Sequence, residues 1–153
     1  MKLALSVANR RKSRTGSSLE YNLAAIFDDE NLKYEEQVVT ENRKKPDFIF
    51  PSGEAYHSPE FPLEGLTMLA AKTCCKDRWR QVLSEADKIK QKHLFTLQQG
   101  VTSNQLQEME AGGVNLVIPK TNMRSFPKEW HKKILNLTDF VDLVKRKQDQ
   151  AIG

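Results

Sequence analysis

A short apolar segment that ends in a lysine constrains the fold of this chain more than any other feature of its sequence. Residues 66–71 are apolar apart from Thr67, and Lys72 follows them. An apolar run of this length is typical of a central strand that is buried on both faces of a sheet. The ammonium group at its end must lie in a cleft or meet a charged partner, because an unpaired buried charge is costly. The sequence therefore predicts a buried strand that ends at a cleft.

A helix and two strands are expected before this segment. Ser17-Ser18-Leu19-Glu20 has the form of a capping box, and apolar residues at helical spacing follow it, which predicts a first helix ending near residues 28–29. Residues 34–40 and 47–50 are typical of strands, and a proline and a glycine end the second of them. The prolines and glycines of residues 51–65 predict a long irregular connection to the buried strand.

Helices and strands are expected to alternate in the rest of the chain. An apolar stripe at helical spacing predicts a helix over residues 77–90. Residues 93–97 and 114–118 are typical of strands. Further helices are expected to begin at Thr102 and at Thr138, since both threonines can cap a helix.

The order of these elements indicates the fold class. Three strands in succession, followed by alternating helices and strands, predict an α/β fold with a mixed central β-sheet flanked by helices. A doubly wound nucleotide-binding fold is not expected, because no glycine-rich phosphate loop follows any strand, and no nucleotide cofactor is expected either. The chain shows no repeat and no linker, so a single domain spanning residues 1–153 is expected.

Basic residues gather near the start of the chain. Lysine and arginine number 24 against 20 acids, which is only a mild indication of a polyanionic partner. Residues 1–19 contain no acid and include Lys2, Arg10, Arg11, Lys12 and Arg14. Such a stretch suits contact with phosphates, although a solvated charged face explains it equally well.

The cysteines and the first residues bear on the compartment. Cys74 and Cys75 are adjacent, so they can neither readily bridge to each other nor form a tetrahedral metal site alone. Two thiols in a reducing compartment and no secretory cleavage pattern predict a cytoplasmic protein. No apolar run approaches the ~20 residues that span a bilayer, so no membrane partner is expected.

Two acids and the lysine could form a site for phosphodiester chemistry. Asp47 begins the strand expected beside that of Lys72, and Glu85 lies on the polar stripe of the next predicted helix. Carboxylates at a sheet edge suit Mg²⁺, which prefers one or two of them plus phosphate oxygens and water. The metal would stabilise charge on the phosphate and help form the attacking hydroxide, which the lysine would hold or deprotonate. Structural explanations also exist: a turn for Asp47, a surface amine for Lys72, and pairing with Lys88 or Arg78 for Glu85.

The pattern resembles the PD-(D/E)xK nuclease superfamily. Pro46-Asp47 matches its PD, and Lys72 matches its last lysine. The acid expected two residues before the lysine is Ala70 here. In one subset of restriction enzymes this acid has moved onto the following helix, where Glu85 lies. The resemblance implies a restriction-endonuclease-like core in which Asp47 and Glu85 bind Mg²⁺ and Lys72 is catalytic.

Four segments carry a closer resemblance: Arg10-Arg11-Lys12-Ser13-Arg14-Thr15-Gly16, Lys45-Pro46-Asp47-Phe48-Ile49-Phe50-Pro51-Ser52, Ala70-Ala71-Lys72-Thr73-Cys74-Cys75-Lys76-Asp77-Arg78-Trp79-Arg80 and Glu85-Ala86-Asp87. Together they resemble the catalytic domain of type IIE restriction endonucleases that cut CC(A/T)GG. Cys74 takes the place of an expected threonine.

The resemblance implies that a homodimer in a bacterial or archaeal cytoplasm hydrolyses both strands of double-stranded DNA and leaves 5′-phosphates. Lys76, Asp77 and Arg78 match the base-reading segment. Lysine and arginine suit guanine O6 and N7, and aspartate can accept from cytosine N4. A capped helix start with surface charges is the structural alternative.

Two further residues are expected near the site. Tyr56, in the long connection, is a candidate to contact the scissile phosphate or its neighbour, although a loop tyrosine packed on the core is common. Glu20 could assist the metal from the first helix, but its place in the capping box also explains it.

The resemblance also implies that this domain is shortened at its N-terminus and lacks an upstream effector-DNA domain. Two other functions are therefore kept open. One is a DNA-binding fragment that does not cut, and the other is a structure-specific repair or resolving nuclease on the same core. The triplet Lys76-Asp77-Arg78 favours site-specific cleavage over the last of these, because a structure-selective enzyme has less use for a base-reading cluster.

Overall fold

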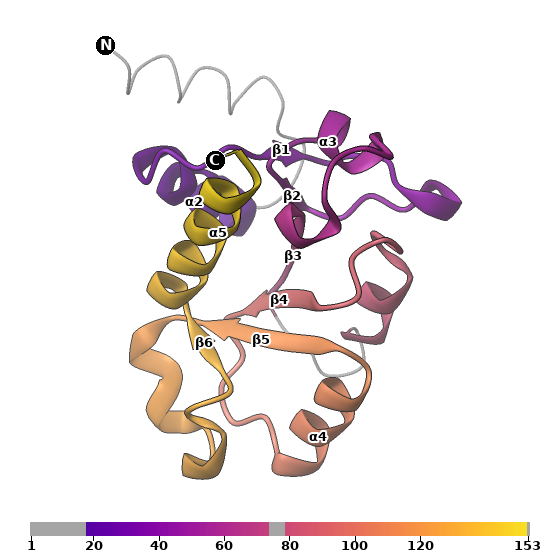
Figure 1. Cartoon of the computed structure of the whole chain (residues 1–153). Coiled ribbons are helices and arrows are strands. Elements are labelled where there is room, and N and C mark those ends of the chain that lie inside the picture. The colour runs from indigo at the N-terminus through magenta and orange to yellow at the C-terminus, as the bar shows by residue number, and fades with distance from the viewer. Residues whose placement is uncertain (1–17, 74–78, 153) are drawn as a thin grey trace.

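A mixed β-sheet forms the centre of the molecule. The computed structural model describes residues 18–73 and 79–152, and within these the sheet has six strands in chain order. The first three strands pair antiparallel and the last four pair parallel, which confirms the predicted mixed sheet (Figure 1). The strands are β1 (Glu35–Glu36), β2 (Phe48–Phe50), β3 (Thr67–Lys72), β4 (Lys92–Thr96), β5 (Val114–Ile118) and β6 (Leu135–Asn136).

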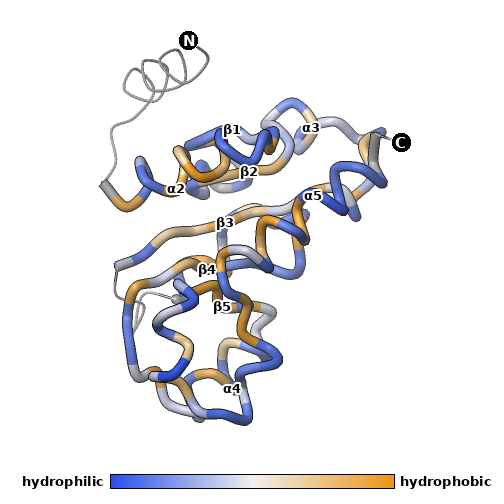
Figure 2. Tube along the Cα trace, turned by 90° about the vertical axis from the view of Figure 1, so that its left-hand side faces the viewer, coloured by the Kyte–Doolittle hydropathy of each residue, from blue (hydrophilic) through white to orange (hydrophobic). Residues whose placement is uncertain are grey.

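Helices cover both faces of the sheet. On one face, α2 (Ser18–Asp29) and α5 (Leu137–Ile152) lie together, and Lys145 of α5 pairs with Glu30 just after α2 at 2.8 Å. On the other face lies α4 (Ser103–Ala111), together with short 3₁₀ segments. In Figure 2 the apolar colour follows β4 and β5 between these layers. The α/β fold with a flanked central sheet is therefore confirmed.

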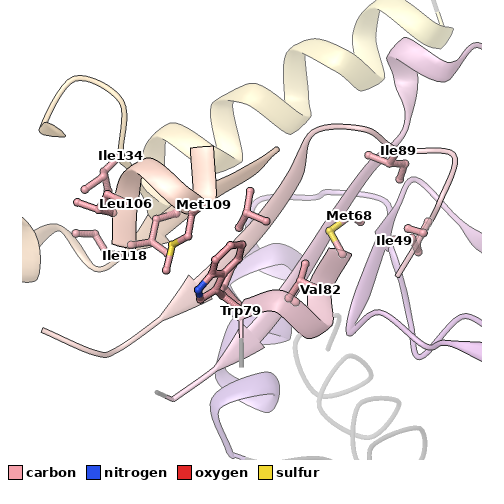
Figure 3. Close-up of a cluster of buried hydrophobic side chains, with 14 of the residues drawn as sticks. Ile49, Met68, Trp79, Val82, Ile89, Leu106, Met109, Ile118 and Ile134 are labelled. Atoms are coloured by element: carbon pink, nitrogen blue, oxygen red, sulfur yellow. The ribbon is translucent and has the colours of Figure 1, made fainter. Parts of the chain in front are cut away.

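The central strands divide their side chains between two apolar clusters, because successive side chains point to opposite faces. Met68 and Ala70 belong to the cluster on the α4 face (Figure 3), whereas Leu69 and Ala71 belong to the cluster under α2 and α5. The second cluster is rich in aromatic rings that meet edge to face, and Phe27 contacts Phe48 and Phe50 in this way.

The predicted buried strand is confirmed, and Lys72 is its first partly exposed side chain. The strands expected at residues 47–50, 93–97 and 114–118 are present to within one residue at each end. Thr102 caps α4 with the reciprocal hydrogen bonds of a capping box to Gln105, as expected. The last helix begins at Leu137 instead of Thr138, because Asn136 Oδ1 accepts from the Asp139 amide at 2.8 Å.

The helix predicted over residues 77–90 is wrong over its described part. Trp79–Ser84 forms a 3₁₀ segment, η3, and Ala86 follows with a left-handed φ of 50°. Spacings of three residues suit a 3₁₀ turn as well as an α-helix. Trp79 and Val82 are accordingly buried, as the stripe required, without a long α-helix.

Two other segments differ from expectation. Only Glu35–Glu36 of the strand expected over residues 34–40 pairs with β2, because Gln37 takes a left-handed φ of 56° that ends the extended backbone. The connection expected to be irregular contains a short helix, α3 (Gly53–His57), which Ser52 caps by accepting from the Ala55 amide.

No helix within residues 18–73 and 79–152 is long and apolar enough to cross a membrane.

His93 of β4 predicts how the fold responds to acid. The ring is 4% exposed, and burial, with a smaller effect of Lys147, lowers its pKa to about 4. The unfolded chain takes up this proton near pH 6.5, so the free energy of unfolding falls as pH falls from 6.5 to 4, by on the order of 3 kcal/mol. The variant His93→Leu should lack this acid-induced fall in the free energy of unfolding, which urea unfolding at pH 7 and pH 4 measures. Exposed His57→Gln is the matched control, and parallel pH curves for His93→Leu and wild type would contradict the prediction.

Candidate active site

Asp47 is held against the end of β3. Its Oδ2 accepts the backbone amide of Ala71 at 2.7 Å, and its Oδ1 accepts Gln37 Nε2 at 3.3 Å. The backbone atom it binds belongs to the residue before Lys72, so the aspartate and the lysine are brought to the same end of two paired strands. The position at the start of β2, where the sheet ladder ends, leaves the Ala71 amide free for this side-chain contact.

Lys72 emerges where the buried strand meets solvent. By the alternation of β3, it lies on the same face as Met68 and Ala70. Ala70, where the superfamily pattern has an acid, is fully buried in the cluster on that face. Lys72 is close enough to Glu85 and Glu20 for its positive charge to lower the pKa of both.

Glu85 approaches from the segment after η3. Burial raises the pKa of its carboxyl to about 7, Lys72 opposes this rise, and the charge of Asp47 adds to it. Its Oε1 is buried and has no hydrogen-bond partner among the described residues. The structure therefore places Glu85 within the influence of the charges of Lys72 and Asp47, and the catalytic and metal-binding roles of the three residues stay predictions.

Glu20 of α2 joins these groups from the other face of the sheet. Burial is the largest cause that raises the pKa of its carboxyl to about 7. The charge of Asp47 and a hydrogen bond with Asp47 raise this pKa further, and the charge of Lys72 opposes the rise. A negative charge in contact with a carboxyl disfavours its ionised form, so Glu20 is the group that retains a proton here. The sequence offers two explanations for Glu20, a place in a capping box and assistance to a metal from the first helix.

The donor set fits Mg²⁺ better than a softer metal. The charged oxygens come from Asp47, Glu85 and Glu20, and a buried carboxylate oxygen without a partner is what a cation would satisfy. Within the described ranges 18–73 and 79–152, no three histidines, cysteines or acids are arranged to hold a metal ion by themselves. Phosphate oxygens and water would have to complete the coordination of Mg²⁺ at these carboxylates.

Tyr56 does not join this group. It is fully buried, its hydroxyl donates to Glu41 Oε1 at 2.5 Å, and its Oη accepts the Lys88 amide at 3.1 Å. Burial, followed by the hydrogen bond to Glu41, raises its pKa. The structure thus gives Tyr56 the packed position that was its alternative explanation, and contact with a phosphate stays a prediction.

The predicted DNA-contacting residues lie outside the described part of the chain. The base-reading triplet falls between Thr73, which follows β3, and Trp79, which begins η3, so it is flanked by the segments that carry Lys72 and Glu85. The contacts of these residues with DNA stay predictions: Arg10, Arg11, Lys12, Arg14, Lys76, Asp77 and Arg78.

Comparisons with known sequences show the family of the chain. A family model described as the EcoRII C terminal matches residues 1–141. The chain is 53% identical over 140 residues to the type II restriction enzyme EcoRII of Escherichia coli, and the match covers 91% of the chain but 35% of EcoRII. The chain therefore spans about a third of that relative's length.

Solved structures show the same fold. Metal-depleted Ecl18kI in complex with uncleaved, modified DNA has a TM-score of 0.75 at 21% identity, and its complex with uncleaved DNA has 0.74 at 20%. Each match covers 96% of this chain and 50% of the Ecl18kI chain. At such identities the likeness establishes the restriction-endonuclease-like fold.

The raised pKa of Glu85 predicts a stability cost that a metal would remove. The folded carboxyl keeps its proton up to about pH 7 and the unfolded one only to about 4.5, so stability falls as pH rises through this window. Without metal, Glu85→Gln should gain stability over wild type between pH 4 and 8, by about 1 kcal/mol after solvent screening. Urea unfolding at pH 4 and pH 8 measures the stability of Glu85→Gln and wild type, with exposed Glu108→Gln as control. The same stability difference between Glu85→Gln and wild type at pH 4 and at pH 8 would contradict the prediction.

Proposed function

Because the chain belongs to the EcoRII C-terminal family, we propose that it is the catalytic domain of a Mg²⁺-dependent type II restriction endonuclease. The observation that carries the proposal is the buried, partnerless Oε1 of Glu85 beside Asp47 and Lys72. It supports a site built to receive a cation together with the scissile phosphate of double-stranded DNA.

Each residue has a distinct role in the proposed reaction. Asp47 and Glu85 would hold Mg²⁺, which supplies charge stabilisation on the phosphate and acidifies water when bound. Asp47 is oriented by the Ala71 amide, so its carboxylate keeps one direction. Lys72 orients the attacking water or the phosphate oxygen, and it holds positive charge where negative charge develops. Glu20 contributes a carboxyl next to Asp47 that can hold a proton while no cation is bound.

The proposed substrate is a CC(A/T)GG-like site, cut on both strands to leave 5′-phosphates. Lys76, Asp77 and Arg78 would read C·G pairs, and the basic residues of the 10–14 segment would contact phosphates. A near-palindromic site is matched by a homodimer, which places one active site on each strand. The family match favours neither the non-cutting fragment nor the structure-specific nuclease.

Cleavage of unmethylated plasmid with CC(A/T)GG sites tests the activity. With Mg²⁺, the wild type should give discrete fragments with 5′-phosphate ends, and none with EDTA. Lys72→Ala should cut at least about 100-fold more slowly, because transition-state charge loses its partner. Exposed Lys132→Ala is the control for loss of a positive charge. Intact plasmid from folded, DNA-binding wild type would refute the nuclease, and a strict monomer in size-exclusion chromatography would refute the dimer.

Base reading and phosphate contact should respond differently to mutation. Arg78→Ala should weaken binding to CC(A/T)GG by about 1–3 kcal/mol and relax the preference at one base pair. Arg11→Ala should weaken binding to all sequences alike and reduce the salt slope by about one. Fluorescence anisotropy with cognate and single-mismatch duplexes at several salt concentrations measures both. Equal losses on cognate and mismatched DNA for Arg78→Ala would contradict the base-reading role.

A further inference from the structure

The segment that carries Glu85 has no regular secondary structure beyond η3, yet side chains from elsewhere in the chain bind its backbone. Three successive amides donate to side chains from three distant positions, in place of the carbonyls that a helix would offer. Ala86 N donates to Thr40 Oγ1 at 3.2 Å, Asp87 N donates to Glu41 Oε1 at 3.2 Å, and Lys88 N donates to Tyr56 Oη at 3.1 Å.

A buried lysine binds the carbonyls of the same segment. Lys92 of β4 is 5% exposed, and its Nζ donates to the carbonyls of Ala86 at 3.0 Å and Ile89 at 2.6 Å. Burial lowers its pKa, while Asp87, Glu85 and Glu41 act in the opposite direction. A charged donor that bridges two carbonyls is a strong constraint, because charge-assisted hydrogen bonds exceed neutral ones.

The side chains that hold the segment also bind one another. Tyr56 donates its hydroxyl to Glu41 at 2.5 Å, so one carboxylate oxygen accepts both this group and the Asp87 amide. Lys88 closes the network, since its Nζ donates to the Tyr56 carbonyl at 2.6 Å and lies 5.3 Å from the ring centre. Residues 40–41, α3 and β4 thus form a cradle around residues 86–89.

The cradle holds a strained residue directly beside Glu85. Ala86 has a φ of 50° and is fully buried, a conformation that costs a residue with a Cβ about 1 kcal/mol or more. Both its amide and its carbonyl are bound by the cradle. The backbone turn at Ala86 sets the direction in which the neighbouring Glu85 side chain leaves the chain.

We propose that Thr40, Glu41, Tyr56 and Lys92 are positioning residues that orient Glu85 for its ligand, an inference that rests on the proposed nuclease function. Glu85 Oε1 has no hydrogen bond among the described residues to fix it, whereas the backbone that follows Glu85 is bound by these four side chains. A device of this kind leaves the carboxylate oxygen free for a cation and still limits its freedom. Supporting groups around metal ligands typically affect affinity or activity by about 10–100-fold.

Glu41 offers the sharpest test. Glu41→Ala removes both hydrogen bonds that its Oε1 accepts, and Glu41→Gln keeps an oxygen that can accept both. In steady-state cleavage of a cognate duplex, Glu41→Ala should lower kcat by about 10–100-fold with the KM for DNA changed less than about twofold. Glu41→Gln should recover to within about threefold of wild type. Exposed Glu110→Ala controls for loss of an acid.

Tyr56→Phe separates positioning from direct contact with DNA. It keeps the buried ring and removes the hydroxyl that links Glu41 to the Lys88 amide. If the two residues act through one network, the double variant Glu41→Ala/Tyr56→Phe should lose no more than about threefold beyond the worse single variant. A loss of kcat in the double variant equal to the product of the two single-variant losses would show that Tyr56 acts independently of Glu41. That result would overturn the positioning role of Tyr56.

Mg²⁺ binding to DNA-free protein gives a readout apart from activity. Calorimetry should show a dissociation constant about tenfold higher in Glu41→Ala and restored in Glu41→Gln. Wild type that binds Mg²⁺ but cuts no DNA would end the nuclease proposal, and this pattern of affinities would still support positioning. Unchanged kcat and affinity in Glu41→Ala, or losses that Glu41→Gln does not restore, would overturn positioning while leaving a cleaving wild type as a nuclease.

Discussion

The burial of β3 on both faces is the constraint on which the rest of the structure depends. Its side chains enter two apolar clusters in alternation, so no charge can be tolerated until the strand ends. Lys72 occupies that end, and Asp47 reaches it through the Ala71 amide. The packing of the sheet thus confines the lysine to the end of the strand, and the neighbouring carboxylates must come to it from other elements.

The charges gathered there do not satisfy one another. Glu20 and Glu85 both have a pKa raised to about 7, chiefly by burial, even though Lys72 lies close enough to oppose the rise. Such an arrangement destabilises the fold at neutral pH and is relieved by a cation or by protons. Strain of this kind, together with the left-handed Ala86, is typical of places where a protein gives up stability for function.

Local patterns predicted the parts of the fold that depend on local burial. The apolar run before Lys72 and the capping threonine at position 102 were sufficient to place β3 and the start of α4. The segment of residues 77–90 was mispredicted because its apolar spacing fits two kinds of helix. The hydrogen bonds that decide its conformation come from partners 46 and 32 positions away, which no local pattern contains.

The position of the second acid links these observations. An acid at position 70 would be oriented by the sheet itself, since β3 is hydrogen-bonded on both sides, but here that position is a fully buried alanine. Glu85 comes from a segment without a helix or sheet ladder, and such a segment defines a side chain poorly unless other groups bind its backbone. In the proposed site, the side chains of Thr40, Glu41, Tyr56 and Lys92 would therefore orient Glu85, in place of the backbone hydrogen bonds that would orient an acid at position 70.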